Sequence, residues 1–186
     1  MKPTTSFLPA LLLIGGLVAT GSAIAAEDVL SRQTRGDTQP SSETLLQTTS
    51  IFRRLAVALA SGSEEAMNDL HGSQVENSDE KDRLNPPIPG IECDIDRIVN
   101  YVSCFSPVSD SKERADTLFT QFVNELQAAL PSDSWLGMEA KPGIDSIRRY
   151  TYEEQKSGAH IDIDMVVQVG SEGQNTYAVS IFGWTF

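Results

Sequence analysis

The chain has 186 residues, with 14 lysine and arginine residues against 26 aspartate and glutamate residues, and its formal net charge is −12 at pH 7. A chain this acidic repels nucleic-acid phosphates and anionic lipid surfaces, so we expect neither a nucleic-acid partner nor a lipid-surface role. The acidity suits solubility, attraction of cations, or a basic protein partner.

The first 26 residues have the organisation of a secretory signal peptide. Lys2 supplies a positive start, an apolar run covers residues 7–18, and small residues precede the expected cleavage after Ala25 or Ala26. The apolar run has about a dozen residues, whereas a membrane-spanning helix needs about 20, so we expect cleavage and no stable membrane anchoring. The sequence thus predicts an exported protein, periplasmic or extracellular, whose mature form is long enough for one domain.

Residues 27–70 are predicted to be a polar N-terminus followed by an amphipathic helical segment. Apolar side chains recur at helical spacing in the second half of this stretch: Leu45, Phe52, Leu55 and Leu59. Ser61 and Glu64 have the spacing of a capping box for a second, short helix. We expect this segment to lie on the domain core; the alternative is a helix that binds a partner or a second copy.

Residues 71–90 are predicted to be a polar, proline-rich linker. Residues 77–83 are all polar or charged, and three prolines follow within a few positions: Pro86, Pro87 and Pro89. Few of the side chains are suited to burial: Val75, Leu84 and Ile88. The linker would separate the helical segment from a C-terminal α+β globular domain of residues 91–186.

Cys93 and Cys104 are the only cysteines, and in an exported chain an even pair predicts a disulfide. In one continuous helix the two residues would lie about 16 Å apart, whereas a disulfide needs Cα atoms within about 7 Å. We therefore expect a turn near residues 94–98 and then a strand that ends at Phe105. Zinc is disfavoured because the two histidines, at positions 71 and 160, are far from the cysteines and from each other.

The clearest predicted element is a helix over residues 111–130. Its apolar face consists of Ala115, Leu118, Phe119, Phe122, Val123, Leu126 and Leu130. We expect Asp110 to cap its start, with Glu113 three residues on, and Pro131 to end it.

The remaining chain is predicted to be rich in strands, over residues 135–139, 147–154, 159–169 and 177–184. The fold class that follows is α+β: one long helix packed on a mostly antiparallel sheet of four to five strands, preceded by the N-terminal helical segment. The last strand is apolar on both faces, so we expect it to be covered on both sides.

A two-residue turn at Ser157 and Gly158 would place Tyr152 opposite Ile163 and Tyr150 opposite Met165, with the apolar side chains on one face. A three-residue loop would instead place the two tyrosines opposite Asp162 and Asp164. We favour the first register, which also places Glu153 opposite Asp162.

The best candidate for chemistry is a polar cluster on one predicted strand face, where His160, Asp162 and Asp164 alternate with apolar residues and Glu153 joins them from the neighbouring strand. Such a set could offer oxygens to Ca²⁺. However, residues two apart on a strand are separated by about 6.5 to 7 Å, so the three side chains cannot converge on one ion. We favour a solvated strand face, and we expect no metal, cofactor or catalytic residues here.

The chain has no GxSxG nucleophile elbow and no phosphate-binding glycine loop. The function expected from the sequence is therefore that of a small, acidic, exported binding or interaction protein, of the inhibitor or immunity type, with a basic protein partner. The alternatives are a small-ligand or lipid carrier and a small secreted hydrolase with an unrecognised site. A buried cavity would favour the carrier, a cleft with His160 beside a carboxylate and a hydroxyl the hydrolase, and a solid core with an exposed apolar patch the binding protein.

Overall fold

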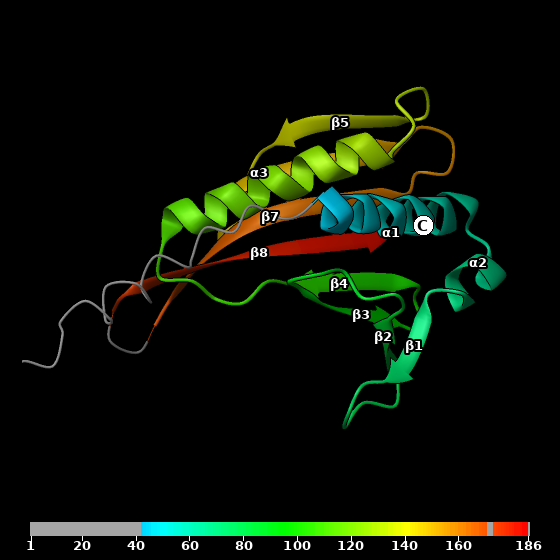
Figure 1. Ribbon diagram of the computed structural model, residues 1–186, viewed down its shortest axis with the longest axis horizontal. Helices are drawn as coiled ribbons and strands as arrows, with labels where there is room; N and C mark the ends of the chain where they lie inside the picture. Colours follow the sequence, from blue (N-terminus) through cyan, green and yellow to red (C-terminus); the bar gives the residue numbers. More distant parts are fainter. Residues whose placement is uncertain (1–41, 171–172, 186) are drawn as a thin grey trace, which may run out of the picture. The chain divides into compact units, whose positions relative to one another are not determined.

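The computed structural model describes residues 42–170 and 173–185, shown as a ribbon in Figure 1. The predicted signal peptide and the polar stretch that follows it lie outside the described residues. The helices are α1 (Ser42–Ser61), α2 (Glu64–Asn68) and α3 (Lys112–Ala129). The strands are β1 (His71–Gln74), β2 (Lys81–Leu84), β3 (Glu92–Asp96), β4 (Tyr101–Phe105), β5 (Trp135–Ala140), β6 (Ser146–Glu154), β7 (His160–Val169) and β8 (Asn175–Trp184).

The strands form one antiparallel sheet in the order β1-β2-β3-β4-β8-β7-β6-β5. From β4 the chain crosses through α3 to the far edge of the sheet and returns through three hairpins, until β8 pairs with β4. The expected sheet of four to five strands under one long helix is therefore wrong. The sheet has eight strands, because β1, β2 and β3 extend it beyond β4, and strands of four to five residues are too short to show a clear periodicity. The helix layer contains α1 as well as α3.

Figure 1 shows α1 and α3 side by side along one face of the sheet. Phe52 of α1 and Phe122 of α3 meet edge to face with ring centroids 6.1 Å apart, and both are fully buried. Leu59 of α1 lies so close to Gly183 of β8 that a Cβ atom there would be 2.8 Å from the Leu59 Cδ1 atom. The amphipathic N-terminal segment therefore packs on the core.

Residues 71–90 differ from the expected linker because they contain β1 and β2, which pair with each other, while β2 pairs with β3. Leu84 and Ile88 are buried in the core. The run of polar residues favoured a linker over a strand. However, a four-residue strand with one exposed face has only two inward side chains, so most of its residues can be polar. In β2 the inward side chains are Asp82 and Leu84, and Asp82 is itself polar.

The segment that holds the cysteines is the β3–β4 hairpin, with a turn over residues 97–100 in place of the predicted turn near residues 94–98. Cys93 and Cys104 lie directly opposite each other, with Cα atoms 4.0 Å apart and sulfur atoms 2.11 Å apart. This geometry is compatible with the expected disulfide.

The β6–β7 hairpin has the predicted faces but not the predicted register. Tyr152 pairs with Ile161 and Tyr150 with Ile163, so Glu153 lies opposite His160 and not Asp162. The loop is longer than a two-residue turn because Glu154 folds it: the Glu154 carboxylate accepts hydrogen bonds from the backbone N–H groups of Lys156 and Ser157 and from the Ser157 hydroxyl. A shift of two residues moves each pairing but leaves every side chain on its face.

Candidate functional site

The two faces of the sheet have different neighbours. On β7, Ile161, Ile163 and Met165 point toward the helix layer and are fully buried, while His160, Asp162 and Asp164 point to the opposite face. We call this opposite side the open face. Following the strand pairing, it carries Tyr101, Ser103 and Phe105 of β4, Ser180, Phe182 and Trp184 of β8, the three polar residues of β7, and Arg149, Thr151 and Glu153 of β6.

Asp164 is the most buried charged group of the open face, with a side-chain exposure of 3 %. Arg149 donates two hydrogen bonds to it, from Nε to Oδ1 at 2.8 Å and from a terminal nitrogen to Oδ2 at 2.9 Å. The Ser146 hydroxyl donates a third, at 2.6 Å. The hydrogen bonds with Asp164 raise the pKa of Arg149 above its usual value. This pairing of the guanidinium with both carboxylate oxygens fixes the Arg149 side chain on the open face.

Asp162 is buried as well, but among the described residues it has fewer polar partners than Asp164. Its Oδ2 atom lies 3.9 Å from Arg149 Nε, and its Oδ1 atom is buried without a hydrogen-bond partner. The expectation of a solvated strand face is therefore wrong for Asp162 and Asp164. The alternation of polar and apolar residues identified the two faces correctly, but it could not show that aromatic and arginine side chains of neighbouring strands would cover the carboxylates.

Aromatic side chains surround Asp162. Tyr101 and Phe182 are stacked with centroids 5.9 Å apart, Trp184 lies 6.5 Å from Tyr101, and the imidazole of His160 stacks on Trp184 at 5.3 Å. Burial, together with the nearby charges of Asp162 and Asp164, raises the pKa of Tyr101, so its hydroxyl stays protonated at neutral pH.

The open face is hollowed at two places. A pocket of about 550 Å³ lies among Tyr101, Asp162, Phe182 and Trp184, with Val99 and Arg149 at its sides. A second pocket, of about 600 Å³, lies beside Phe105 and Val108 and has charged residues of β2 and β3 along its border: Arg83, Glu92 and Asp94. Phe105 and Phe182 meet edge to face at 5.6 Å between the two pockets.

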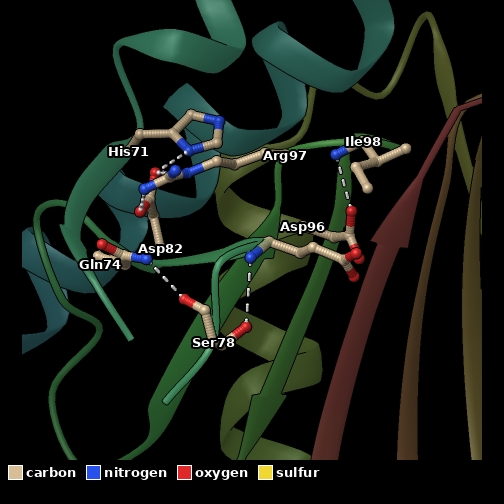
Figure 2. Close-up of polar contacts among 8 residues, drawn as sticks. His71, Gln74, Ser78, Asp82, Asp96, Arg97 and Ile98 are labelled. Carbon is tan, nitrogen blue, oxygen red and sulfur yellow. Dashed lines mark hydrogen bonds and ion pairs between the residues drawn. The ribbon is translucent and has the colours of Figure 1, made fainter. Parts of the chain in front are cut away.

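A second polar cluster joins β1, β2 and the β3–β4 turn, as Figure 2 shows. The Asp82 carboxylate accepts hydrogen bonds from both ends of the Arg97 guanidinium, one of them from Nε at 2.7 Å, and His71 Nδ1 lies 2.8 Å from it. The hydrogen bonds from Arg97, and more weakly the contact with His71, lower the pKa of Asp82 to about 2 against the opposing effect of burial. The sequence pattern gives no sign of this cluster, because His71 and Asp82 lie in the stretch of residues 71–90 that was predicted to be a linker.

The chemistry of this second cluster is that of a fixed ion pair. The neighbouring turn is held by Asp96, which accepts hydrogen bonds from the backbone N–H groups of Ile98 and Val99. A pocket of about 450 Å³ beside the cluster is lined mainly by polar residues. Its lining includes no serine, threonine or cysteine, so the described residues there supply His71 with no nucleophile to activate.

Of the residues predicted as a polar cluster, the structure places all four on the open face, but only Asp162 and Asp164 share a charged partner, Arg149. His160 stacks on Trp184, and Glu153 is exposed opposite it. No group of three or more histidine, cysteine, aspartate or glutamate side chains among the described residues is arranged to hold a metal ion.

Comparison with protein-family models, with curated proteins and with solved structures finds no match to this chain. Within residues 42–170 and 173–185, no helix is long and apolar enough to cross a membrane.

Proposed function

We propose that the protein is an exported binding protein that docks a basic protein partner on its open face. One observation carries this proposal: both long helices lie on the other side of the sheet, and the open face presents half-exposed apolar side chains around buried carboxylates. Apolar residues exposed on this face include Phe105 of β4 and Leu136 and Met138 of β5, each about half exposed. Exposed apolar side chains gathered on one face of a protein commonly mark an interaction surface.

The charge of the chain supports a basic partner over a second copy. Loss of a leader that carries Lys2 and no acidic residue would move the net charge from −12 to −13. Two copies of so acidic a chain repel each other, whereas a basic protein is attracted over several ångströms at moderate salt and associates faster. Export follows from the predicted signal peptide, and the cysteine pair is compatible with an oxidising compartment.

The packing of the core speaks against the carrier alternative. A cavity that holds a small ligand would leave accessible surface on the residues that line it. Between the helices and the sheet, Leu55, Phe119 and Ile163 are each at most 1 % exposed. The pockets on the open face are surface depressions and not enclosed volumes, which suits docking of a protein surface.

The experiment that tests the proposal compares two matched surface variants of the mature protein. Phe105→Ser removes an apolar side chain from the open face, and Val57→Ser removes one of similar exposure from the outer side of α1. Proteins of the exported fraction are captured on each variant, identified by mass spectrometry, purified and titrated by calorimetry. We expect a partner with an isoelectric point above about 9.

The partner should bind the Val57→Ser variant as it binds the unaltered protein and bind the Phe105→Ser variant at least about 10-fold more weakly, the loss of one interface anchor. An acidic partner, or equal binding to both variants, would overturn the proposal.

A further inference from the structure

We infer that the pocket around Asp162 and Trp184 is a receptor for a lysine side chain, whose ammonium group would lie against the Asp162 carboxylate and the aromatic rings. This inference rests on the proposed function, because it names the chemical group by which a basic partner would be recognised. The pocket is lined by Tyr101, Phe182 and Trp184 and has a volume of about 550 Å³.

The first step is the charge balance of the pocket. Arg149 is bound through two hydrogen bonds to Asp164, so the charges of these two groups cancel. Asp162 stands next to this pair with its nearest oxygen 3.9 Å from Arg149 Nε, and among the described residues no other arginine or lysine lines the pocket. Two carboxylates and one guanidinium therefore leave an excess negative charge on Asp162. A buried charge without a matched partner is costly, and an incoming cation would relieve that cost.

The second step is hydrogen bonding. Residue Asp162 is 9 % exposed, and its Oδ1 atom has no hydrogen-bond partner among the described residues. Buried carboxylate oxygens in folded proteins are ordinarily satisfied. A buried Oδ1 is out of reach of a ligand, so the oxygen that Asp162 can offer to the pocket is Oδ2. Its distance of 3.9 Å from Arg149 Nε is too long for a hydrogen bond, and Oδ2 can therefore accept one from a donor outside the chain.

The third step is the aromatic lining. Tyr101, Phe182 and Trp184 are all partly exposed, and Tyr101 lies near both of the other rings, so the rings form a continuous wall beside the carboxylate. Indole and phenol rings attract cations through their faces, and they also cover the methylene stem of a long side chain. A wall of this type recognises an alkylammonium group better than an inorganic cation, which would gain nothing from the apolar surface.

The fourth step separates lysine from arginine. A guanidinium is held best by a carboxylate that offers both oxygens, as Asp164 does for Arg149. Asp162 can offer only one oxygen to a ligand, because Oδ1 is buried and Oδ2 lies 3.9 Å from Arg149 Nε. A compact ammonium needs a single acceptor and brings a smaller group next to the existing Arg149 charge. The geometry therefore favours lysine.

The test uses nuclear magnetic resonance titration of the full mature protein. The probe is Nα-acetyl-lysine N-methylamide, and the signal followed is the indole N–H of Trp184. The matched control probes are the norleucine analogue, which has the stem without the ammonium, the Nε-acetylated analogue, and the arginine analogue. We expect saturable binding of the lysine probe with a dissociation constant on the order of 1–10 mM, the strength of one ion pair and one cation–π contact.

The arginine probe should bind about 3-fold more weakly, because a guanidinium is held best by two carboxylate oxygens and Asp162 offers one. The two uncharged probes should not saturate. Asp162→Asn should weaken the lysine probe by about 10-fold, whereas the control Asp110→Asn, an exposed acid near the other end of β8, should leave it unchanged. Trp184→Leu provides a second, independent loss of affinity, and the dispersion of the amide spectrum shows whether each variant is folded. Equal binding of the norleucine and lysine probes, or binding unaffected by Asp162→Asn, would overturn the inference.

The outcomes for the pocket and for the proposed function are separable. A basic partner whose affinity falls with Phe105→Ser but not with Asp162→Asn would refute the lysine receptor and leave the docking function standing. Binding of the lysine probe that depends on Asp162, without any basic partner, would support the receptor and refute the docking function.

Discussion

Asp82 shows how a single polar residue ties together segments that are distant in the chain. It lies inward on β2 with a side-chain exposure of 8 %, and its two partners come from β1 and from the β3–β4 turn. The pKa of Asp82 is about 2, against 3.8 for an unperturbed aspartate. A carboxyl group whose pKa is lower in the folded state stabilises the fold above its unfolded pKa, and this stabilisation is lost as the pH falls toward the folded pKa.

We therefore predict that part of the stability is lost between about pH 4 and pH 2 and that Asp82→Asn removes this part of the pH dependence. At pH 7 the variant should be less stable by about 1–3 kcal/mol, because hydrogen bonds between charged groups are lost. Urea unfolding at several pH values measures both effects. The control Glu76→Gln removes an exposed acid of the same segment and should change neither. A pH profile of Asp82→Asn parallel to that of the unaltered protein would contradict the prediction.

The start of α3 is decided by one hydroxyl group. The sequence predicts Asp110 as the cap, but in the structure Ser111 is the cap, and its Oγ atom accepts a hydrogen bond from the Arg114 N–H at 3.2 Å. We predict that Ser111→Ala destabilises the protein by about 1 kcal/mol. Thermal unfolding of Ser111→Ala and of Asp110→Ala compares the two candidates directly. A larger loss for Asp110→Ala would show that the cap is at residue 110.

At the scale of elements, the contact between α1 and β8 depends on the absence of a side chain at residue 183. A Cβ atom there would lie 2.8 Å from Leu59 Cδ1, which is closer than carbon atoms pack. We predict that Gly183→Ala costs about 1–3 kcal/mol, the usual cost of overpacking a core. Chemical denaturation measures this cost. The control is the same substitution in a Leu59→Ala protein, where the space freed by Leu59 should make Gly183→Ala less costly. If the losses of the two single variants simply add in the double variant, the two residues are not in direct contact.

The β3–β4 hairpin is the second element with a testable constraint. Cys93 and Cys104 are directly paired, and the loop that a bond between them closes is short. We predict that alkylation of the native exported protein followed by mass spectrometry finds neither thiol modified. Replacement of both cysteines by alanine should lower the free energy of unfolding by about 3 kcal/mol in the chain-entropy account. Two freely alkylated cysteines in the native protein would refute the bond.

At the scale of the whole molecule, the topology accounts for the separation of core and binding surface. The helix layer, α1 with α3, covers one face of the sheet, and the core lies between them. Insertion of β8 between β4 and β7 brings the aromatic residues of β4 and β8 next to the carboxylates of β7. The proposed site thus combines residues of β4, from the N-terminal half of the sheet, with residues of β7 and β8, from the C-terminal half.

The predicted signal peptide belongs to this scale because it decides the compartment in which the whole chain folds. We predict that the exported protein begins at Ala26 or Glu27. Its intact mass, with N-terminal sequencing, measures the cleavage point. A mature species that retains residues 1–25 would refute the prediction. It would also remove the reason to expect a disulfide, which is folding in an oxidising compartment.

The sequence by itself determined the elements with strong periodicity. The helix at residues 111–130, the long strands of the C-terminal half and the faces of β7 were all predicted correctly, because an apolar stripe at period 3.6 or 2 depends only on local geometry. The cysteine pair was also predicted, because two thiols in an exported chain leave one pairing.

Only the tertiary structure decided the number of strands, the hairpin register and the site. β1 and β2 are short, and their inward positions include the polar Asp82, so no apolar alternation marks them. The register of β6 and β7 depends on how the Glu154 side chain folds the loop. The site also depends on β8 pairing with β4. The β7–β8 hairpin places Trp184 and Phe182 near Asp162, but only the β4–β8 pairing adds Tyr101. Pairing between residues some 80 positions apart leaves no trace in the local sequence.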